Sequence, residues 1–285
     1  MTSPYRDLDR PPLREAALRR ALLAPGSAAD RGLWRSIRVV DSTASTNADL
    51  VAAARAGEPE GTVLVAEQQT AGRGRLDRSW VAPARSGLMF SVLFRPATVP
   101  PPQRGWLPLL AGVAVTDALA VLVPDLAVAL KWPNDVLAGP DQRKLGGILV
   151  ELAGDAAVIG TGLNVSLRSD ELPVPTATSL ALEGAPADRD SLLRAILRAL
   201  GDRYRAWTAA GGNPEPSGLR ADYVERCGTL GRDVCIQRPA QPDLVGTATG
   251  IDPYGQLVVA VAGAGGGDGA AEQQIVGAGD VLHLR

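Results

Sequence analysis

The stretch RKLGGILVELAGDAAVIGTGLNVS, residues 143–166, decides how the chain is read. It contains two apolar runs, 146–153 and 156–165, and Gly154 and Asp155 separate them. Short apolar runs on either side of such a turn signal are typical of a β-hairpin. The stretch therefore predicts two neighbouring antiparallel strands.

Outward from this hairpin, more strands are expected where apolar runs are bounded by turn residues. These runs are 36–40, 61–68, 87–94 and 127–130. Helices are expected where apolar residues recur every three to four positions, at 12–24, 48–56, 188–210 and 219–227. This mixture predicts an α+β fold, in which a mixed or antiparallel sheet is flanked by helices.

From Gly228 onward the chain changes to short strands with turn signals between them. The turn signals include residues 252–255 and the glycine-rich loop 263–270. Five short strands in under about sixty residues are typical of a small barrel. We therefore expect a short helical extension over 1–35, a main domain over 36–227 and a C-terminal barrel over 228–285.

One segment, Trp106–Val123, is apolar enough to be weighed as a membrane span. Its length is near the lower limit for crossing a bilayer. Asp117 would lie inside the span without an obvious partner, and segments that look like strands of one fold flank the run. A buried central helix is the better interpretation, and no membrane contact is expected.

The charge balance argues against a nucleic-acid-binding protein. Lys+Arg total 29 and Asp+Glu total 31, so the formal net charge is -2, whereas binding to DNA usually needs a basic excess. The first twenty residues carry charges from Arg6 onward and contain no apolar core of a secretory signal. We therefore expect a cytoplasmic protein with no DNA partner.

Cysteine and histidine are too scarce for several kinds of chemistry. The chain has two cysteines, Cys227 and Cys235, and one histidine, His283, close to the C-terminal end. A catalytic triad would need that histidine as its base, and the three side chains have no recognised zinc spacing. The sequence favours chemistry that needs neither residue type.

Lysine is much rarer than arginine in this chain. The chain contains 27 arginines and two lysines, Lys131 and Lys144. A composition bias toward arginine explains the imbalance but not the place where the lysines remain. A position that keeps lysine in such a chain points to a need for a compact ammonium that a planar guanidinium cannot replace.

The loop Gly72-Arg73-Gly74-Arg75 follows an expected strand and places two guanidinium groups between glycines. Glycine lets the backbone approach a ligand closely, and arginine offers forked donors suited to phosphate or carboxylate. The loop matches neither a dinucleotide fingerprint nor a P-loop. It predicts an anion site, with a plain surface loop as the alternative.

The second polar segment is Lys131-Trp132-Pro133-Asn134-Asp135, which ends a strand. Its amide and carboxylate suit a base, a ribose or Mg²⁺, although Pro-Asn-Asp is also good turn chemistry. Lys144 follows after a short loop, and Asn164 ends the next strand but one, where a ligand contact and a simple turn are equally compatible with the pattern.

These residues together resemble the ordered motif set of biotin protein ligases. The motifs are STN at 45–47, AEQQTAGRGRLDRSW at 66–80, LKWPNDV at 130–136, RKLGGILVE at 143–151 and GTGLNVS at 160–166. Each motif alone is weak, but five in the same order are specific. The resemblance covers roughly residues 36–166, and it implies the catalytic fold of that family, which is like that of class II aminoacyl-tRNA synthetases, followed by an SH3-like barrel.

The resemblance implies a two-step reaction. Biotin and ATP, with Mg²⁺, would form biotinyl-5'-AMP and pyrophosphate, and one lysine of a biotin carboxyl carrier domain of a carboxylase such as acetyl-CoA carboxylase would then take the biotinyl group. Joining a carboxylate to a triphosphate brings negative groups together, so cations at the meeting point favour binding and the transition state. Positioning and electrostatics would do the catalysis, and no histidine is needed.

The resemblance also implies a role for each motif residue. Biotin contacts are expected from Ser45, Thr46, Asn47, Gln69, Arg73, Gly74, Arg75 and Lys144. Contacts with ATP and the adenylate are expected from Arg73, Arg75, Trp80, Lys131, Asn134, Asp135 and Asn164, with Trp132 packing nearby. The expected catalytic residues are Lys144, Arg75 and Asp135, and Asp135 is also a candidate ligand for Mg²⁺.

The sequence departs from the family pattern in three places. Ser42-Thr43 could replace Ser45-Thr46, because DSTASTN contains two Ser-Thr pairs. The loop 136–143 is longer than expected, and the roughly 35 residues before the first strand are too few for a winged helix-turn-helix. A monofunctional ligase is expected, with a lipoate ligase and a non-catalytic biotin or nucleotide sensor as alternatives. The oligomeric state and the role of the barrel stay open.

Overall fold

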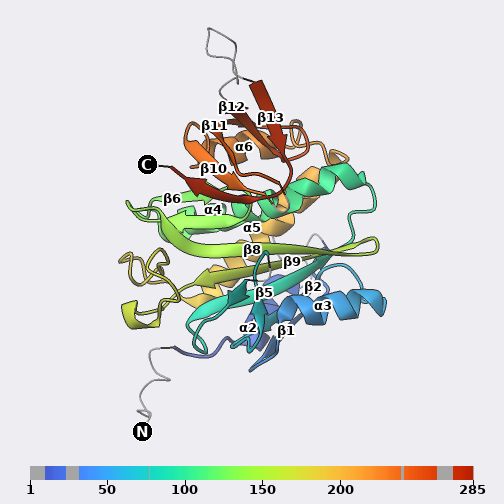
Figure 1. Ribbon diagram of the computed structural model, residues 1–285. Helices are drawn as coiled ribbons and strands as arrows, with labels where there is room; N and C mark the ends of the chain where they lie inside the picture. Colours follow the sequence, from blue (N-terminus) through green and yellow to red (C-terminus); the bar gives the residue numbers. More distant parts are fainter. Residues whose placement is uncertain (1–9, 24–31, 77, 239–240, 262–271, 285) are drawn as a thin grey trace.

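The computed structural model describes residues 10–23, 32–76, 78–238, 241–261 and 272–284. The glycine-rich loop 263–270 lies outside the described residues, as do parts of the N-terminal extension. The described residues form a seven-stranded sheet, a five-stranded sheet and a two-stranded ribbon, with helices packed around them (Figure 1).

The large sheet is mixed, as the sequence predicts, and the expected hairpin lies inside it. Its strands are β1 (Ser36–Val40), β2 (Thr62–Ala66), β5 (Gly87–Phe94), β6 (Val128–Lys131), β7 (Asp135–Ala138), β8 (Arg143–Ala153) and β9 (Ala156–Asn164). Their order is β1-β2-β5-β9-β8-β7-β6. Strands β1 and β2 are parallel, and every other neighbouring pair is antiparallel. The hairpin β8-β9 pairs from Ala153↔Ala156 to Gly146↔Leu163.

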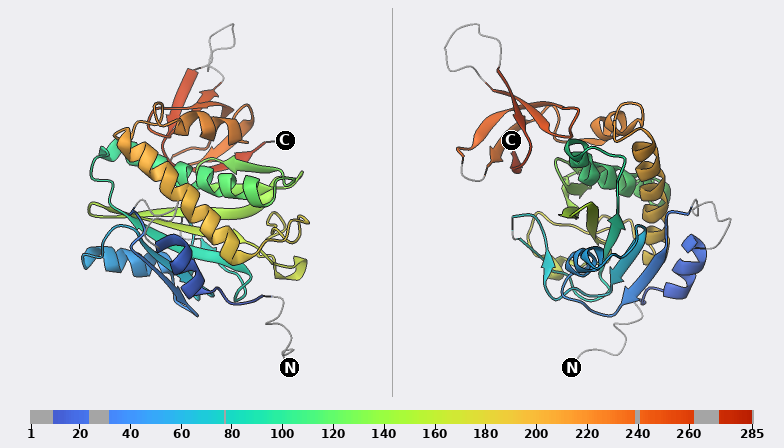
Figure 2. Two further views of the ribbon diagram at one scale, coloured as in Figure 1. Left: turned by 180° about the vertical axis from the view of Figure 1, so that it is seen from behind. Right: turned by 90° about the vertical axis from the view of Figure 1, so that its right-hand side faces the viewer.

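Helices cover both faces of this sheet. Behind it, α4 (Leu107–Leu122) and α5 (Arg189–Ala209) cross each other, as Figure 2 shows. On the opposite face, α3 (Thr46–Arg55) packs on β5, β8 and β9. The alternation of β2 explains both layers, because Val63 and Val65 belong to the core under α4 and α5 while Leu64 belongs to the core under α3. Helix α2 (Glu15–Leu23) packs beside β1.

The apolar segment that was weighed as a membrane span forms a core helix. A 3-10 helix, η1 (Pro101–Trp106), leads directly into α4, and 67% of the most apolar window of this segment is buried inside the protein. Asp117, which would have had no partner in a bilayer, forms ion pairs with Arg203 of α5 and Arg226 of α6 (Leu219–Arg226). The expectation of a buried central helix is confirmed.

The C-terminal part is an antiparallel sheet of five strands, as expected. They are β10 (Asp233–Gln237), β11 (Leu244–Ile251), β12 (Leu257–Val261), β13 (Glu272–Val276) and β14 (Asp280–His283), in the order β13-β12-β11-β10-β14. Strands β13 and β14 are the outer strands of that order, so the pairings of the described residues leave the expected barrel unclosed.

Indole groups of the main domain hold this small sheet in place. Trp106 Nε1 donates to Pro253 O at 2.9 Å and Trp132 Nε1 donates to Gly255 O at 3.0 Å. Both indoles are buried, and both acceptors belong to the turn between β11 and β12. The two sheets therefore meet next to the segment 131–135.

Two strand pairings were not predicted. Residues 136–143 were expected to be a loop, but Asp135–Ala138 forms β7 and β8 begins at Arg143, because these segments pair with each other. The segment between β2 and β5 contains the ribbon β3 (Gly72–Arg73) and β4 (Ser79–Trp80). Strands of two to four residues have too little alternation to show in a sequence.

Candidate active site

A strip of glycines on β8 and β9 forms the floor of the site, on the face that carries α3. Gly147 and Gly162 are register partners, and Gly160 lies two residues before Gly162. A Cβ atom at Gly162 would come within 2.5 Å of Trp80 Cε2, and one at Gly160 would overlap Asn47 Oδ1. The bare backbone lets Trp80 and Asn47 lie directly on the sheet.

Polar side chains gather at the start of α3. Ser45 caps this helix, since its Oγ accepts from Ala48 N at 3.4 Å. Gln69 Oε1 accepts from Thr46 N at 2.8 Å and from Thr46 Oγ1 at 3.1 Å. Ser45 and Thr46 are buried, whereas Ser42 is exposed and Thr43 donates to Asp49 instead. Thr46 of the second pair thus contacts the Gln69 side chain, while Thr43 of the first pair is the backbone bridge partner of Gln69.

The buried side chains of Ser91 and Asn47 extend this network across the sheet. Ser91 Oγ lies 2.7 Å from Thr46 Oγ1 and donates to Asn47 Oδ1 at 2.6 Å. Asn47 Nδ2 donates to Glu151 Oε2 at 2.9 Å. Ser91 and Glu151 were not predicted from the sequence. Period-two counting would have found Glu151, because Gly147, Leu149 and Glu151 share one face of β8.

The segment that begins at Gly72 and contains Arg73, Arg75 and Arg78, called the arginine loop, lies across this face and is held by Arg73 and by Arg75. Arg73 pairs with Glu151 at 3.1 Å. Arg75 Nη1 donates to Asn134 Oδ1 at 3.0 Å, and its Nη2 donates to Gly279 O at 3.3 Å. Gly74 contributes its backbone, since its N–H donates to Arg78 O at 2.6 Å.

Lys144 is held by its side chain and by its backbone. Its Nζ donates to Asp135 Oδ1 at 2.7 Å. Lys144 N donates to Thr176 O at 2.7 Å, and Thr178 N donates to Lys144 O at 2.9 Å. The ammonium side chain is 34% exposed, so it stays accessible while its direction is restrained.

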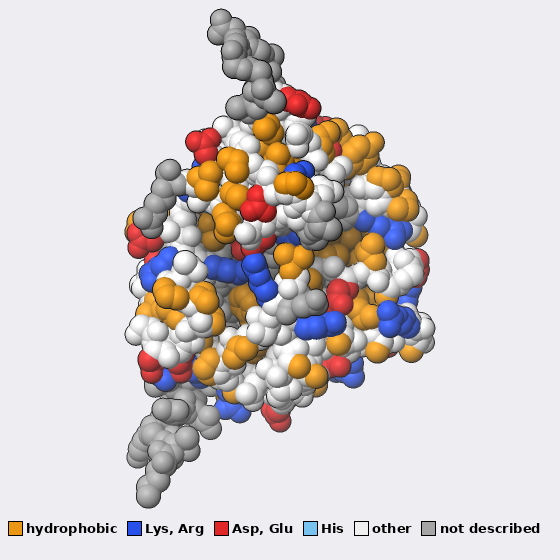
Figure 3. Space-filling view, in the orientation of Figure 1, with side chains coloured by type: hydrophobic (Ala, Val, Ile, Leu, Met, Phe, Trp, Pro, Cys, Tyr) orange, Lys and Arg blue, Asp and Glu red, His pale blue; other side chains and the backbone are white. Residues whose placement is uncertain are grey.

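Cations outnumber carboxylates in this part of the site. Arg75, Arg78 and Lys131 lie within electrostatic range of Asp135 and Asp280, and Lys144 forms an ion pair with Asp135. Burial lowers the pKa of Lys131 and of Arg75, because each charged form loses hydration, while Asp135 and Asp280 oppose the shift. Figure 3 shows Lys and Arg side chains gathered in the middle of this face. A partly desolvated cationic surface of this kind suits an anionic ligand.

Asn164, a predicted contact, and Trp132, predicted to pack nearby, have structural partners instead of an open position. Asn164 is 5% exposed and its Nδ2 donates to Thr178 O at 2.9 Å. Trp132 is 2% exposed, and its Nε1 is bonded to Gly255 O. Their side chains shape the neighbouring segments, which include the strand partner of Lys144.

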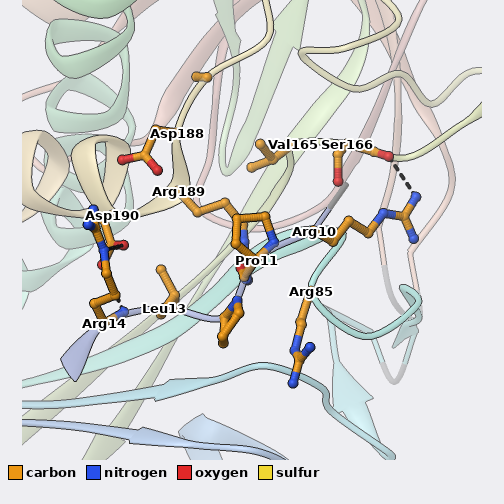
Figure 4. A pocket seen from close by; sticks show the side chains of 12 residues that line it. Arg10, Pro11, Leu13, Arg14, Arg85, Val165, Ser166, Asp188, Arg189 and Asp190 are labelled. Carbon is orange, nitrogen blue, oxygen red and sulfur yellow. Dashed lines mark hydrogen bonds and ion pairs between the residues drawn. The ribbon is translucent and has the colours of Figure 1, made fainter. Parts of the chain in front are cut away.

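A separate cavity of about 360 Å³ lies at another part of the large sheet. Its walls come from residues 10–14, from Arg85, from Val165 and Ser166 and from the start of α5. Figure 4 shows the Arg10 guanidinium beside Ser166, whose carbonyl oxygen accepts from Nη2 at 2.7 Å. No predicted site residue is among the described residues that line it.

Known proteins with a similar sequence or structure agree on one family. Residues 37–164 match the family model of the biotin/lipoate A/B protein ligase family. The biotin--[acetyl-CoA-carboxylase] ligase of Mycobacterium tuberculosis is 45% identical over 98% of this chain and 99% of its own length. The bifunctional ligase/repressor BirA of Escherichia coli is 34% identical over 81% of this chain and 70% of its own. A solved biotin protein ligase from Aquifex aeolicus in complex with biotin and ATP superimposes with a TM-score of 0.70 and 25% identity, covering 88% of this chain and 100% of that one.

Proposed function

The chain belongs to the biotin/lipoate A/B protein ligase family, and on this premise we propose that it is a biotin protein ligase. It condenses biotin with ATP to biotinyl-5'-AMP and transfers the biotinyl group to one lysine of a biotin carboxyl carrier domain. The carrier is proposed to be that of acetyl-CoA carboxylase, because the curated relative of 45% identity carries that name.

The observation that carries this proposal is the glycine floor with a polar cluster at one end and cations at the other. Thr46 and Gln69 can exchange their mutual hydrogen bonds, and Asn47 its bond with Glu151, for those of a ureido ring. Arg75 and Lys144 offer positive charge where a carboxylate and a phosphate would meet. A molecule with a polar ring, an apolar middle and a carboxylate tail matches this order of polar cluster, glycine floor and cations.

The remaining motif residues are assigned from the same arrangement. We propose that Ser45 keeps the start of α3 in place beside the ring, and that Arg73 and Gly74 close over the ligand once Arg73 leaves Glu151. On the nucleotide side we propose Trp80, Lys131, Asn134 and Asp135 as contacts, with Asn164 acting through Thr178 and thus on the backbone of Lys144.

In the first step, a carboxylate oxygen of biotin attacks the α-phosphorus of ATP, and the bond to pyrophosphate breaks. Lys144 is proposed to neutralise the two oxyanions as they approach, because Asp135 and two backbone hydrogen bonds restrain it beforehand. In the second step, the amine of the carrier lysine attacks the acyl carbon, loses a proton and releases AMP. Arg75 is proposed to retain the adenylate between the two steps.

A magnesium ion is proposed to arrive with the phosphates. Across the described part of the chain, no three His, Cys, Asp or Glu side chains converge. Mg²⁺ commonly takes one or two carboxylates together with substrate phosphates and water, and Asp135 lies among the cations of the site. These residues fit such an ion: Asp135 would hold it, and the ion would offset phosphate charge.

The test is release of pyrophosphate from ATP with biotin, followed by incorporation of biotin into a purified carrier domain. A ligase requires both, and both must depend on biotin. Replacing biotin by lipoate checks the second activity named by the family model: preferential turnover of lipoate would replace this proposal by a lipoate ligase. Binding of biotin without any pyrophosphate release would indicate a sensor.

We further propose that the chain is monofunctional and works in the cytoplasm, where ATP is available. The relative that matches it over 99% of its length is named as a ligase alone. The proposed organisation is an N-terminal extension over 1–35, a catalytic domain over 36–227 and a C-terminal SH3-like domain over 228–285. Absence of a DNA partner is part of the same proposal and can be tested by mobility shift with random-sequence duplexes.

A further inference from the structure

Arg75 and Arg78, in the arginine loop between β3 and β4, reach the same turn of the C-terminal sheet. Arg78 forms an ion pair with Asp280, and Arg75 Nη2 donates to Gly279 O at 3.3 Å. The loop joins β3 and β4 of the two-stranded ribbon, whereas Gly279 and Asp280 lie about two hundred positions later, at the start of β14. Both arginines belong to the motif at 66–80, whereas Gly279 and Asp280 lie outside all five motifs.

The turn that receives the arginines is firmly placed. Asp280 pairs with Gln237 of β10, so the first residue of β14 is anchored in the small sheet. A Cβ atom at Gly279 would come within 2.6 Å of Ile236 Cγ2, which shows how closely this turn packs on β10. A carboxylate on such a turn can hold a loop in one position.

The loop transmits the position of Arg78 to Arg75 through its backbone. Gly74 N donates to Arg78 O at 2.6 Å, and Arg78 N donates to Arg75 O at 3.2 Å. Restraining Arg78 therefore restrains the main chain on both sides of Arg75. Arg75 in turn points at Asn134, on the segment that carries Asp135.

The Arg78–Asp280 pair is too exposed to contribute much to the stability of the fold. Arg78 is 60% exposed and Asp280 is 23% exposed. Ion pairs that are this open to solvent stabilise a fold only slightly, since water and salt screen them and both side chains lose freedom. The pair can nevertheless decide which of several positions a short loop occupies.

We propose that Asp280 is a positioning residue for the adenylate, which it serves by holding Arg78 and thereby placing Arg75. This inference rests on the proposed function of the site. The C-terminal sheet then completes the active site by fixing the loop that retains biotinyl-AMP. Weakening the pair should open the loop more often, so that the adenylate leaves before a carrier lysine reaches it.

The test compares Asp280→Asn with Asp233→Asn in the full chain. Asp233 lies at the opposite end of β10, where its carboxylate accepts from Thr247 Oγ1 at 2.7 Å, and serves as the matched control. Trypsin cleavage after Arg75 and Arg78 in the absence of ligand reports how often the loop opens. Release of preformed biotinyl-AMP reports retention. For Asp280→Asn we expect both rates to rise about two- to fivefold, the factor that corresponds to an exposed ion pair, with Tm unchanged.

Two further variants exclude a general loss of structure. Asp280→Glu keeps the charge and should restore most of the protection, and the double variant Arg78→Asp with Asp280→Arg should restore it by reversing the pair. The variants are compared by cleavage after Arg75 alone, because the double variant loses the trypsin site at position 78 and gains one at position 280. The inference is overturned when Asp280→Asn matches Asp233→Asn in both rates, or when the reversed pair is as open as Asp280→Asn. Cleavage needs neither biotin nor ATP, so its outcome stands apart from failure of the wild type to release pyrophosphate, which would count against the proposed function alone.

Discussion

The Nζ atom of Lys144 lies 2.7 Å from Oδ1 of Asp135, although the two residues are not register partners. The sheet pairs Asp135 with Gly147 and Lys144 with Leu137, and the register shifts between Val136 and Leu137. The lysine side chain therefore runs along the sheet to the carboxylate. It passes close to Gly147, where a Cβ would lie in ordinary contact with Lys144 Nζ at 3.6 Å.

This geometry predicts that arginine cannot replace Lys144. A guanidinium is planar and wider than an ammonium, so it would keep the charge but not the position of Lys144 Nζ beside Asp135 Oδ1. Both Lys144→Ala and Lys144→Arg should lower the rate of pyrophosphate release by about 10²-fold or more, the range seen when a donor to a developing charge is lost. Thermal melting should be unchanged. Near-normal turnover by Lys144→Arg would contradict the requirement for lysine.

The glycine floor predicts a strong effect of one added methyl group. In Gly162→Ala the new Cβ would lie within 2.5 Å of the Trp80 ring, which must move off the sheet. We expect weaker binding of biotin, a change in tryptophan fluorescence and a destabilisation of about 1–3 kcal/mol, as for overpacked sites. Gly250→Ala is the control, because nothing lies within 4 Å of its Cβ position. Equal biotin affinity in both variants would rule out the floor as a binding surface.

His283 predicts a specific pH dependence of stability. Burial, together with Lys131 and Arg232, lowers its pKa from 6.5 to about 4. Thr229 Oγ1, which accepts from Trp132 N at 3.1 Å, lies 3.1 Å from His283 Nε2 and can donate only to a neutral imidazole. The unfolded chain binds the proton first as the pH falls, so this group lowers stability between pH 6.5 and pH 4.

The measurement is the difference in free energy of unfolding between the wild type and His283→Gln as a function of pH. Carboxylates whose pKa is lowered, such as Glu171 and Asp188, change the stability of both proteins in the same way and cancel. The difference should become less favourable to the wild type from pH 6.5 down to pH 4 and be constant above pH 7.5. A flat difference across the whole range would show that His283 titrates normally in the folded protein.

The buried ion pair Glu67–Arg189 is expected to be important for folding. Its atoms lie 2.6 Å apart at 4% and 7% side-chain exposure, and Glu67 also accepts from Leu13 N at 2.6 Å. Arg189→Met leaves the Glu67 carboxylate buried without its cation, so urea unfolding should show a loss of about 3–5 kcal/mol. Arg19→Met, which removes an exposed pair with Glu15, should cost under about 1 kcal/mol. Similar losses in the two variants would contradict the difference in burial.

Much of the candidate site could be predicted from the sequence because its residues lie in short motifs. Thr46, Gln69, Asn134 and Lys144 each lie next to a strand or helix that the pattern predicts, and Arg75 lies in a glycine-arginine motif. Neighbours along the chain are fixed by local geometry, so a motif on a strand end already has a definite direction. The residues missed were those that enter through pairing or packing: Ser91, Glu151 and Asp280.

By itself, the sequence determined the longer elements and the class of fold. The hairpin at 143–166, the strand Gly87–Phe94 and the helices over 107–122 and 189–209 follow from apolar periodicity and turn residues, which act over a few positions. Only the tertiary structure decided the order of the strands and the short pairs β3-β4 and β7-β8. It also decided the hydrogen bond of Thr46 with Gln69 and the contact of Arg75 and Arg78 with Gly279 and Asp280. These features join residues that are far apart in sequence or belong to strands too short for a pattern. They arise from burial and pairing in the assembled core, which no local window of the sequence contains.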